Sequence, residues 1–471
     1  IPVGSAGISF TWCERWVEWH FVARLFGTDG VRGVANQDLT AELALDLSVA
    51  AAHVLGEAGA FGHRQPTALV ARDPRASGEF LEAAVCAGLA SAGVDVLRVG
   101  VIPTPAAAYL VKEYRTDLGV MLSASHNPMP DNGIKFFSRG GVKLPDDLED
   151  AIEQRMGEPW ARPVGDKVGR IRYTPQAVDT YVDHLVRSLR QQDTLKGLKI
   201  VLDTANGASY YTASAAFKAQ SAEVVAIHDQ PDGLNINERC GSPHPEKLQA
   251  KVVEVGADMG LAFDGDADRC LAVDHDGNII DGDHIIAILA LALQEDHRLA
   301  SNTVVATIMS NLGLILAMRE HDIHVDQTKV GDRYVLESMN ANGFSLGGEQ
   351  SGHVIMSEFA TTGDGVLTGL HLAARVARTG KTLKELASVM TRLPQALVNV
   401  RGVDKLRAGI DPDVNKAVAD ANQKLGDTGR VVLRPSGTEP VVRVMVEAAT
   451  QEEADQLCSE LAETVKSCLA L

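Results

Sequence analysis

The sequence contains no long apolar run, so it offers no segment that would cross a membrane. A membrane-spanning helix needs about 20 consecutive apolar residues, and the apolar stretches of this chain are shorter than that. The first residues also lack the basic start and the uniform apolar core of a signal peptide. We therefore expect no membrane partner and a cytoplasmic location.

A disulfide framework is missing as well. The six cysteines lie at positions 13, 86, 240, 270, 458 and 468, with no C-x-x-C pair and no regular spacing. Such scattered cysteines are typical of reduced thiols in a cytosolic protein. Basic residues are also few: the chain has 44 lysines and arginines but 62 aspartates and glutamates, which gives a net charge of −18. This balance argues against nucleic acid as a partner.

Residues 1–21 do not match the rest of the chain. They hold three of the four tryptophans, Trp12, Trp16 and Trp19. We interpret 1–21 as a translated leader upstream of a start at Val22, or as a real amphipathic extension. The intact mass of the native protein distinguishes the two, because a start well upstream of Val22 contradicts the first interpretation.

The most informative stretch is S-A-S-H-N-P-M-P-D-N-G-I-K at residues 123–135. The apolar run at 118–122 predicts a buried strand, so Ser125 follows its C-terminal end, where open α/β sheets bind ligands. His126 and Lys135 add donor groups to the same loop. The pattern predicts a serine that gives or receives an anionic group, although an ordinary polar turn is the alternative.

Three aspartates, Asp264, Asp266 and Asp268, follow a second predicted strand at 257–263. Carboxylates this close repel one another, and a hard divalent cation relieves the repulsion. A calcium loop of the EF-hand kind needs glutamate at its twelfth position, where this chain has His275. Three carboxylates leave ligand positions open for a phosphate oxygen, which is typical of Mg²⁺.

Two glycine-containing turns add recognition groups. R-P-S-G-T-E-P at 434–440, followed by Arg443, lies between two predicted strands and is typical of a phosphate cradle. In G-G-E-Q-S-G-H at 347–353, Glu349 and Ser351 suit a pair of sugar hydroxyls, and His353 suits proton transfer or phosphate binding. Either turn alone is also consistent with an ordinary loop.

These four motifs, in this order, resemble the α-D-phosphohexomutase family, and the resemblance covers nearly the whole chain from residue 22 onward. It implies an α/β fold with four domains: three related mixed α/β sandwich domains and a C-terminal α+β domain around a central cleft. L-F-G-T-D-G-V-R-G at 25–33 and Gln350 favour the glucosamine branch of the family. The phosphomannomutase/phosphoglucomutase branch usually has methionine at the position of Gln350.

The resemblance and a linker-like stretch at 157–163 divide the chain into parts. We expect a first domain at 22–163 with the serine loop and a second at 164–263 that ends at the metal loop. The third, 264–381, would carry the sugar loop, and the fourth, 382–471, the phosphate loop.

The resemblance implies a phosphoserine enzyme that interconverts glucosamine 6-phosphate and glucosamine 1-phosphate. Ser125 would hand its phosphoryl group to the sugar, and the resulting 1,6-bisphosphate would turn around in the cleft and return its other phosphate. The product would feed the synthesis of UDP-N-acetylglucosamine and peptidoglycan precursors. No Walker A motif occurs, which agrees with turnover without ATP.

The resemblance also gives roles to single residues. Mg²⁺ would be held by Ser125, Asp264, Asp266 and Asp268, and would neutralise charge on the transferring group. Lys135 or His353 would shuttle the hydroxyl proton. The groups expected around the transferring phosphoryl are Arg32, His126, Lys135, Arg269 and His353. The groups expected to bind the substrate are Glu349, Ser351, Arg434, Ser436, Gly437, Thr438 and Arg443.

Two alternative functions stay open. One is a phosphomannomutase/phosphoglucomutase, because Glu349 and Ser351 would contact hydroxyls that all three sugars share. The other is a sugar-phosphate-binding protein without catalysis, which would be expected to have lost Ser125 or an aspartate. A homodimer is compatible with the resemblance, but no residue pattern indicates one.

Overall fold

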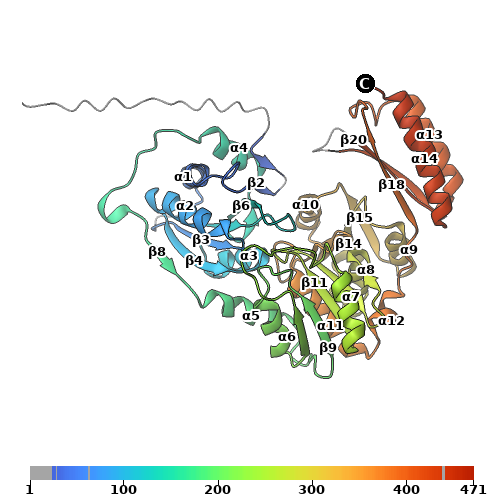
Figure 1. Cartoon of the computed structure of the whole chain (residues 1–471), viewed down its shortest axis with the longest axis horizontal. Coiled ribbons are helices and arrows are strands. Elements are labelled where there is room, and N and C mark those ends of the chain that lie inside the picture. The colour runs from blue at the N-terminus through green and yellow to red at the C-terminus, as the bar shows by residue number, and fades with distance from the viewer. Residues whose placement is uncertain (1–23, 28, 62–63, 437–440) are drawn as a thin grey trace, which may run out of the picture.

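The computed structural model describes residues 24–27, 29–61, 64–436 and 441–471. The predictions on residues 1–21, Gly437 and Thr438 therefore lie outside the described residues. Four sheets of eight, five, four and three strands follow one another along the described chain, and Figure 1 shows them as successive units from blue to red. The expected α/β class with a smaller C-terminal unit is confirmed.

The first sheet has the order β1-β2-β6-β5-β3-β4-β8, with β7 paired to β6. Its central strands, β3, β4 and β5, are parallel, whereas β6 pairs antiparallel to β5. The strands are β1 Phe26–Gly27, β2 Gly30–Val34, β3 Thr67–Arg72, β4 Asp95–Val101, β5 Leu118–Leu122, β6 Asp131–Ser138, β7 Val142–Lys143 and β8 Ile171–Tyr173. The helices are α1 Ala41–Glu57, α2 Ser77–Ser91, α3 Thr104–Glu113 and α4 Asp146–Gln154.

Both faces of the central strands β3 and β5 are buried, which explains why these strands are apolar without alternation. On β3, Ala68 and Val70 pack into one core cluster, and Leu69 and Ala71 into another. Successive side chains of a strand point to opposite faces, so one strand serves two cores. The second of these clusters continues into the next two units.

The second sheet has the order β10-β9-β11-β12-β13, and the third has β15-β14-β16-β17. The strands are β9 Lys199–Asp203, β10 Glu223–Ile227, β11 Met259–Phe263, β12 Cys270–Asp274, β13 Ile279–Ile280, β14 Thr303–Thr307, β15 His324–Thr328, β16 Leu346–Gly348 and β17 Val354–Met356. The helices are α5 Ala177–Ser188, α6 Thr212–Ala219, α7 Glu246–Val255, α8 Gly282–Glu295, α9 Leu312–Glu320, α10 Asp332–Asn342, α11 Gly365–Thr379 and α12 Leu383–Ala387.

Two of the predicted domain borders fall inside sheets. Strand β8 extends the first sheet beyond residue 163, and β12 pairs antiparallel with β11 across the expected border at 263/264. The sequence around the aspartates marks two strands but does not tell whether they share a sheet. The borders themselves stay predictions.

The fourth unit is a three-stranded antiparallel sheet with two helices. Its strands are β18 Gln395–Arg401, β19 Arg430–Pro435 and β20 Val441–Glu447, and its helices are α13 Pro412–Leu425 and α14 Gln451–Cys468. Helix α14 buries Ala454, Leu457, Leu461 and Val465, which confirms the apolar face expected from their spacing.

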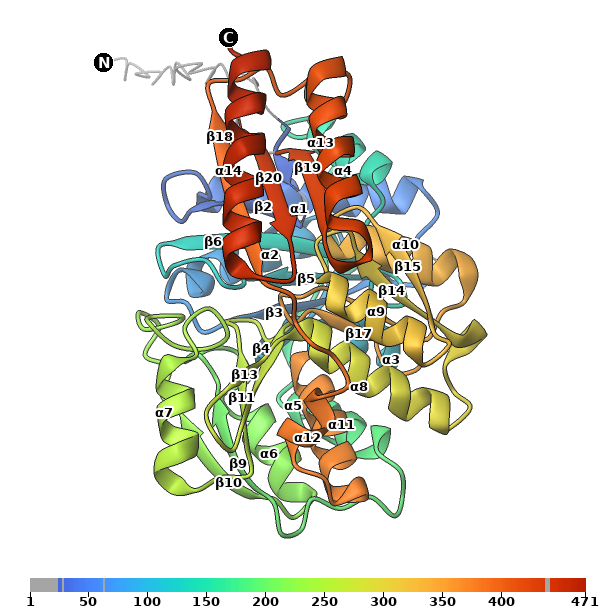
Figure 2. The same cartoon turned by 90° about the vertical axis from the view of Figure 1, so that its right-hand side faces the viewer.

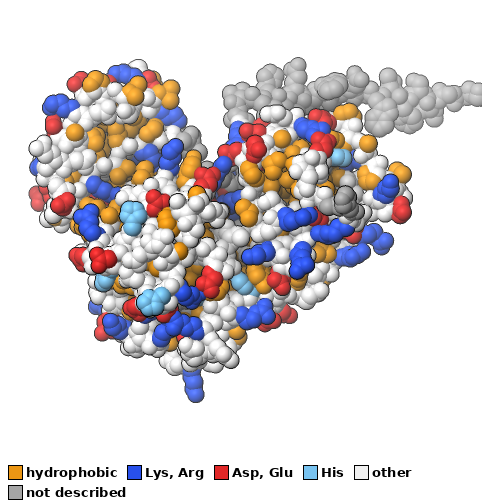
Figure 3. Space-filling view, turned by 180° about the vertical axis from the view of Figure 1, so that it is seen from behind, with side chains coloured by type: hydrophobic (Ala, Val, Ile, Leu, Met, Phe, Trp, Pro, Cys, Tyr) orange, Lys and Arg blue, Asp and Glu red, His pale blue; other side chains and the backbone are white. Residues whose placement is uncertain are grey.

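The fourth unit stands apart from the first one. Figure 2 shows α13 and α14 side by side on the outer face of this unit. The space-filling view shows a notch between the C-terminal lobe and the lobe of the first unit (Figure 3). None of the helices in the described residues is both long and apolar enough to span a membrane.

Candidate active site

Ser125 lies at the mouth of the first sheet, in the loop after β5. We call residues 123–128 the Ser125 loop. Ser125 is 2% exposed, and its φ of +52° places it in the left-handed region that non-glycine residues seldom adopt. Its backbone N–H donates to Ser123 Oγ at 2.9 Å, and Ser123 in turn donates to Asp73 at 2.7 Å. Such backbone strain persists only where the surroundings hold it in place.

A buried arginine supplies that support. Arg75 is fully buried and pairs with Asp73, with Nε 2.9 Å from Oδ2. Its guanidinium donates to the carbonyl oxygens of Ser125 at 3.0 Å and Asn127 at 2.9 Å. It also donates to the carbonyl oxygens of Pro128 and Asp131. Sequence reasoning missed Arg75, because its only sign was an arginine two residues after an aspartate at a strand end.

The aspartates form the hairpin loop between β11 and β12, which we call the aspartate loop (residues 264–268). Ser125 Oγ donates to Asp264 Oδ2 at 2.6 Å, so the two predicted motifs meet across two sheets. Asp266 Oδ2 accepts from Thr104 Oγ1 at 2.6 Å and from Lys135 Nζ at 2.9 Å. Oxygen atoms of Asp264, Asp266 and Asp268 lie within 4.8 Å of one another.

These carboxylates fit a divalent cation. Asp266 Oδ1 and Asp268 Oδ1 are buried and have no hydrogen-bond partner among the described residues, and buried oxygens without partners are costly. Burial, followed by repulsion from Asp268 and Asp266, raises the pKa of Asp264 well above its usual value. A divalent ion among the three would satisfy the free oxygens and stabilise the ionised form. The aspartate loop can therefore hold a metal ion.

A buried ion network lies beside the aspartates. Asp29 pairs with Lys135 at 2.7 Å, with Lys143 at 2.8 Å and with Arg32 at 2.8 Å. Burial favours the neutral form of Asp29, but the charges of Lys135, Lys143 and Arg32 hold its pKa well below the usual value. Asp29 is a further residue whose contacts the sequence did not reveal.

Lys135 keeps its charge in this network. Burial would lower its pKa, but Asp266 and Asp29 raise it above the ordinary value of a lysine. His126 differs, because burial and the charges of Arg269 and Arg32 lower its pKa to about 4. The lowered pKa leaves the His126 imidazole neutral near neutral pH, where its Nδ1, 3.4 Å from Ser125 Oγ, can serve as a hydrogen-bond donor or acceptor.

His353 lies between two partners and is 3% exposed. Its Nδ1 is 3.6 Å from Asp268 Oδ2, and the backbone N–H of Gly363 donates to its Nε2 at 3.1 Å. Only an unprotonated Nε2 accepts a hydrogen bond, so the geometry favours the tautomer with the proton on Nδ1. His353 thereby orients Asp268. The next residue, Arg269, has a mostly buried side chain.

The loop between β16 and β17, which we call the Glu349 loop (residues 349–353), faces the same region. Glu349 Oε1 accepts from the backbone N–H of Gly331 at 3.1 Å, and Ser351 is exposed. Between the first and third units, a cavity of ≈ 190 Å³ is lined by residues that include Asp29, Lys135, Lys143 and Arg333. The ion network therefore borders an open space.

The fourth unit contributes a hairpin of β19 and β20, which we call the arginine hairpin. Arg434 and Arg443 are direct cross-strand partners on it. Burial and the charge of Arg443 lower the pKa of Arg434. Like charges opposite each other on neighbouring strands are destabilising, and an anion bound between them relieves that repulsion. Ser436 is buried, and its carbonyl accepts from Lys405 Nζ at 2.8 Å, a contact that sequence reasoning also missed.

Comparison with known proteins agrees with this geometry. Models of the phosphoglucomutase/phosphomannomutase family match domain I at residues 23–160, domain II at 179–277, domain III at 281–393 and the C-terminal domain at 397–464. The solved structure of a phosphoglucomutase/phosphomannomutase family protein from Burkholderia thailandensis is similar, with a TM-score of 0.80 and 27% identity. The match covers 94% of this chain and 97% of that one.

The chain therefore belongs to the phosphoglucomutase/phosphomannomutase family, the α-D-phosphohexomutases. Within that family, the chain is highly similar to several curated phosphoglucosamine mutases. The one from Cutibacterium acnes is 95% identical over 450 residues, which are 96% of this chain and all of that protein. The one from Streptomyces coelicolor is 64% identical over 453 residues, with coverage of 95% and 100%.

A more distant solved structure shares the fold. It is the Aspergillus fumigatus N-acetylphosphoglucosamine mutase in complex with GlcNAc-6P and magnesium, with a TM-score of 0.66 and 18% identity. The match covers 95% of this chain and 96% of that one.

Proposed function

We propose that this chain is an isomerase that interconverts glucosamine 6-phosphate and glucosamine 1-phosphate through a phosphoserine at Ser125. The observation that carries the proposal is the contact of Ser125 Oγ with Asp264, inside a group of three carboxylates and beside the charged Lys135. A serine hydroxyl held against a cluster of carboxylate oxygens suits phosphoryl transfer, because catalysis there consists of positioning and charge stabilisation. The close relation to curated phosphoglucosamine mutases supports the choice of substrate.

We propose Mg²⁺ as the cation, held by Asp264, Asp266, Asp268 and an oxygen on Ser125. It would supply charge neutralisation to the transferring group. The chain's own residues do the rest of the positioning: Arg75 fixes the Ser125 loop, and Thr104 and Lys135 fix Asp266. Chelation of the metal is expected to remove turnover, and added Mg²⁺ to restore it.

The two candidates for proton transfer are Lys135 and His353. The contacts of both residues argue against a role as a free base. Lys135 is held in its charged form by Asp266 and Asp29, and both ring nitrogens of His353 have partners. We assign Lys135, Arg269 and Arg32 to the stabilisation of negative charge, and His353 to the positioning of Asp268. His126 would act as a neutral donor or acceptor beside Ser125.

The substrate would be held at two places. We propose that Glu349 and Ser351 bind sugar hydroxyls, and that Arg434, Ser436, Gly437, Thr438 and Arg443 bind the phosphate that does not react. The two arginines Arg434 and Arg443, which are cross-strand partners, would give this site its affinity for an anion. With one fixed serine and one fixed phosphate site, the glucosamine 1,6-bisphosphate intermediate must turn around before the second transfer.

The experiment compares kcat/KM for glucosamine 6-phosphate, glucose 6-phosphate and mannose 6-phosphate in Mg²⁺ with a trace of hexose bisphosphate. We expect a large preference for the amino sugar, its loss in Ser125→Ala, and normal activity in Ser138→Ala, a matched serine on β6. A preference for glucose or mannose phosphate would assign the chain to the sister branch. No turnover of any substrate, with phosphate present on Ser125, would favour a sugar-phosphate-binding protein.

A homodimer and a cytoplasmic location remain proposals. The family relation and the lack of a membrane-spanning helix in the described residues are compatible with both. Sedimentation of the purified enzyme tests the first, and cell fractionation tests the second. The role of the product in UDP-N-acetylglucosamine and peptidoglycan precursor synthesis rests on the proposed reaction.

A further inference from the structure

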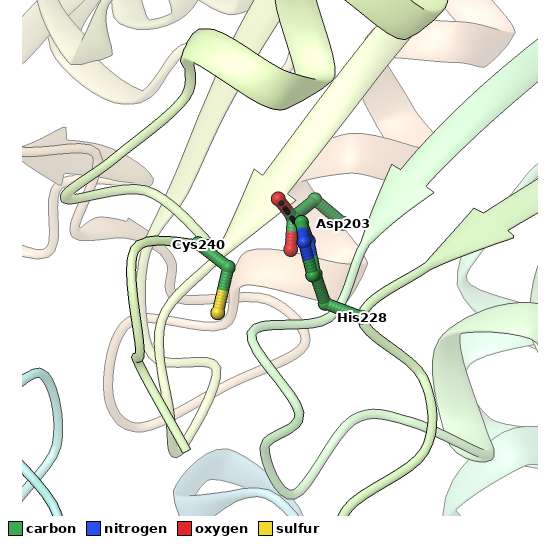
Figure 4. Close-up of side chains that lie close together, drawn as sticks. All are labelled: Asp203, His228 and Cys240. Carbon is green, nitrogen blue, oxygen red and sulfur yellow. Dashed lines mark ion pairs between the residues drawn. The ribbon is translucent and has the colours of Figure 1, made fainter. Parts of the chain in front are cut away.

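A second group of metal-binding side chains lies outside the active site, at the edge of the second sheet. Asp203 ends β9, and His228 directly follows β10, which runs parallel to it with Ile227 paired to Asp203. Cys240 comes from the loop at 237–241, which packs over the same edge. Figure 4 shows the three side chains close together on these three segments.

The three residues have the chemistry of a metal site. One ligand atom from each of Asp203, His228 and Cys240 lies within 4.8 Å of the other two. Zinc is bound in proteins by carboxylate oxygen, imidazole nitrogen and thiolate sulfur, and three protein ligands with a water complete its tetrahedron. Magnesium, which prefers oxygen ligands alone, does not suit this set.

The contacts of Asp203 and His228 also fit a bound cation. Asp203 Oδ2 and His228 Nδ1 pair at 3.0 Å, and neither of these buried atoms has a further hydrogen-bond partner among the described residues. Asp203 is fully buried, and its other oxygen, Oδ1, accepts from the backbone N–H of Ala205 at 2.9 Å. A buried carboxylate is costly unless a cation compensates its charge, and a metal ion bound by both Asp203 and His228 would do so whatever the protonation state of the imidazole.

The backbone conformation at His228 places its side chain beside Asp203. His228 has a φ of +48°, a conformation that residues with a side chain seldom adopt. Its carbonyl accepts from Thr204 Oγ1 at 2.7 Å and from the backbone N–H of Asn206 at 2.6 Å. The side chain of His228 is 17% exposed, so an ion can reach the site from solvent past the imidazole.

We infer that Asp203, His228 and Cys240 form a binding site for a borderline-soft divalent cation of the zinc class, separate from the aspartate loop. Binding replaces the thiol proton of Cys240 by the metal–sulfur bond and releases that proton to water. The imidazole of His228 donates its lone pair at Nδ1, and the carboxylate of Asp203 supplies the third bond. A water takes the remaining position.

The charges around the thiol set a direction for the pH dependence. Burial and then the charge of Asp203 raise the pKa of Cys240 to about 12, while Lys247 opposes and Glu238 adds to this effect. The thiol is thus protonated near neutral pH until metal arrives. Because binding releases the thiol proton of Cys240, the affinity should rise with pH.

The site also borders the support of the Ser125 loop. Asn237, three residues before Cys240, donates through Nδ2 to the carbonyl oxygen of Ser125 at 2.8 Å and to that of Asn127 at 3.1 Å. A metal at Cys240 would tie the 237–241 loop to the ends of β9 and β10. Occupancy is therefore expected to stabilise the second unit.

Cobalt absorption tests the inference in the full-length enzyme with Mg²⁺ in excess, because only a thiolate ligand gives the near-ultraviolet sulfur-to-cobalt band. We expect the band in the wild type, its loss in Cys240→Ser, and its retention in Cys458→Ser, a buried thiol of the fourth unit. His228→Gln, at a partly exposed position, should weaken cobalt binding about tenfold or more. This variant keeps the test valid if Cys240→Ser does not fold.

Zinc-induced stabilisation gives an independent readout. Zn²⁺ should raise the thermal unfolding midpoint of the wild type and of Cys458→Ser, but not that of Cys240→Ser or His228→Gln. Absence of the cobalt band in the wild type, or its persistence in Cys240→Ser, would overturn the inference. A zinc effect that is equal in all four proteins would overturn it as well.

Discussion

The Ser125 loop and the arginine hairpin are supported in opposite ways. The Ser125 loop belongs to the part of the molecule in which three units share one apolar cluster, with members such as Leu69, Phe217 and Leu370. The arginine hairpin belongs to the fourth unit, which has a separate cluster of its own. A unit with its own core behaves as a separate domain and moves against its neighbour unless the interface is large and apolar.

The junction of the fourth unit with the third is polar. The buried carboxylate of Glu447 accepts from Arg430 Nε at 2.7 Å, from Asn311 Nδ2 at 3.1 Å and from the backbone N–H of Leu312 at 3.0 Å. Arg430 also reaches across to the carbonyl of Ser310. These bonds fix where the unit is attached, and polar contacts of this kind can be exchanged for water when a domain moves.

The difference matches what each region has to do in the proposed reaction. Phosphoryl transfer needs a serine, a metal and cations in fixed positions, and the shared core together with Arg75 supplies this rigidity. The phosphate site must release and rebind an intermediate that turns around, which suits a separately built unit at the edge of the notch in Figure 3.

The largest effect is expected on the rigid side. Asp266→Asn keeps the volume of the side chain and its contact with Thr104 but removes one charge from the metal site. We expect kcat to fall about 10³-fold, because charge stabilisation is lost at the transferring group, with KM for the sugar phosphate nearly unchanged. Steady-state kinetics over a Mg²⁺ titration measures this. A change confined to KM would place Asp266 in substrate binding.

The second prediction concerns the support of the Ser125 loop. Arg75→Lys keeps the charge but loses the forked donors to Ser125, Asn127 and Asp73. We expect kcat to fall about 10²-fold and the unfolding free energy to drop by about 3 kcal/mol, since buried carbonyl oxygens of the Ser125 loop lose their hydrogen-bond donors. Arg72→Lys, at a partly buried neighbouring position, is the control. Wild-type kcat in Arg75→Lys would contradict the role assigned to Arg75.

The third prediction sharpens the contrast with the fourth unit. Arg434→Gln or Arg443→Gln should lower kcat/KM about 30-fold, through loss of a charge-assisted hydrogen bond of about 2 kcal/mol. The change should appear mainly in KM, and affinity for inorganic phosphate should fall in parallel. An effect on kcat alone would mean that the hairpin acts on the transfer step and that the two regions do not divide the work.

The smallest effect concerns Asp283 at the start of α8, next to the polar junction. It accepts from the backbone N–H of Asn311 at 2.7 Å, and burial followed by the charge of Asp281 raises its pKa to about 7. Its folded-state pKa is raised, so its contribution to stability is complete below the unfolded value of 3.8 and is lost as pH rises through about 7.

The unfolding free energy of the wild type should decline between pH 4 and pH 7, and Asp283→Asn should remove part of that decline. Each pKa unit between the folded and unfolded states corresponds to about 1.4 kcal/mol. Denaturant unfolding at several pH values measures it, with Asp413→Asn on the surface of α13 as control. Parallel pH profiles for the wild type and Asp283→Asn would show that Asp283 is not held neutral by the fold.

Sequence reasoning located the two loops that meet at the site because each follows a buried strand directly, and strand ends gather at one edge of a sheet. It did not find Arg75, Asp29 or Lys405, because their partners are far away along the chain and a single basic or acidic residue carries no mark of its contacts. It placed a domain border at 263/264, because two strands of one hairpin and two strands of different domains have the same local residue pattern.

The most direct test of the proposed relay is a single-turnover experiment with enzyme phosphorylated on Ser125. Mixing it with glucosamine 6-phosphate in Mg²⁺ should transfer phosphate from the protein to the sugar at least as fast as steady-state turnover, giving glucosamine 1,6-bisphosphate and unmodified Ser125 by intact mass. If the sugar phosphate is converted while the phosphate on Ser125 stays in place, phosphoserine is not an intermediate and the account is wrong.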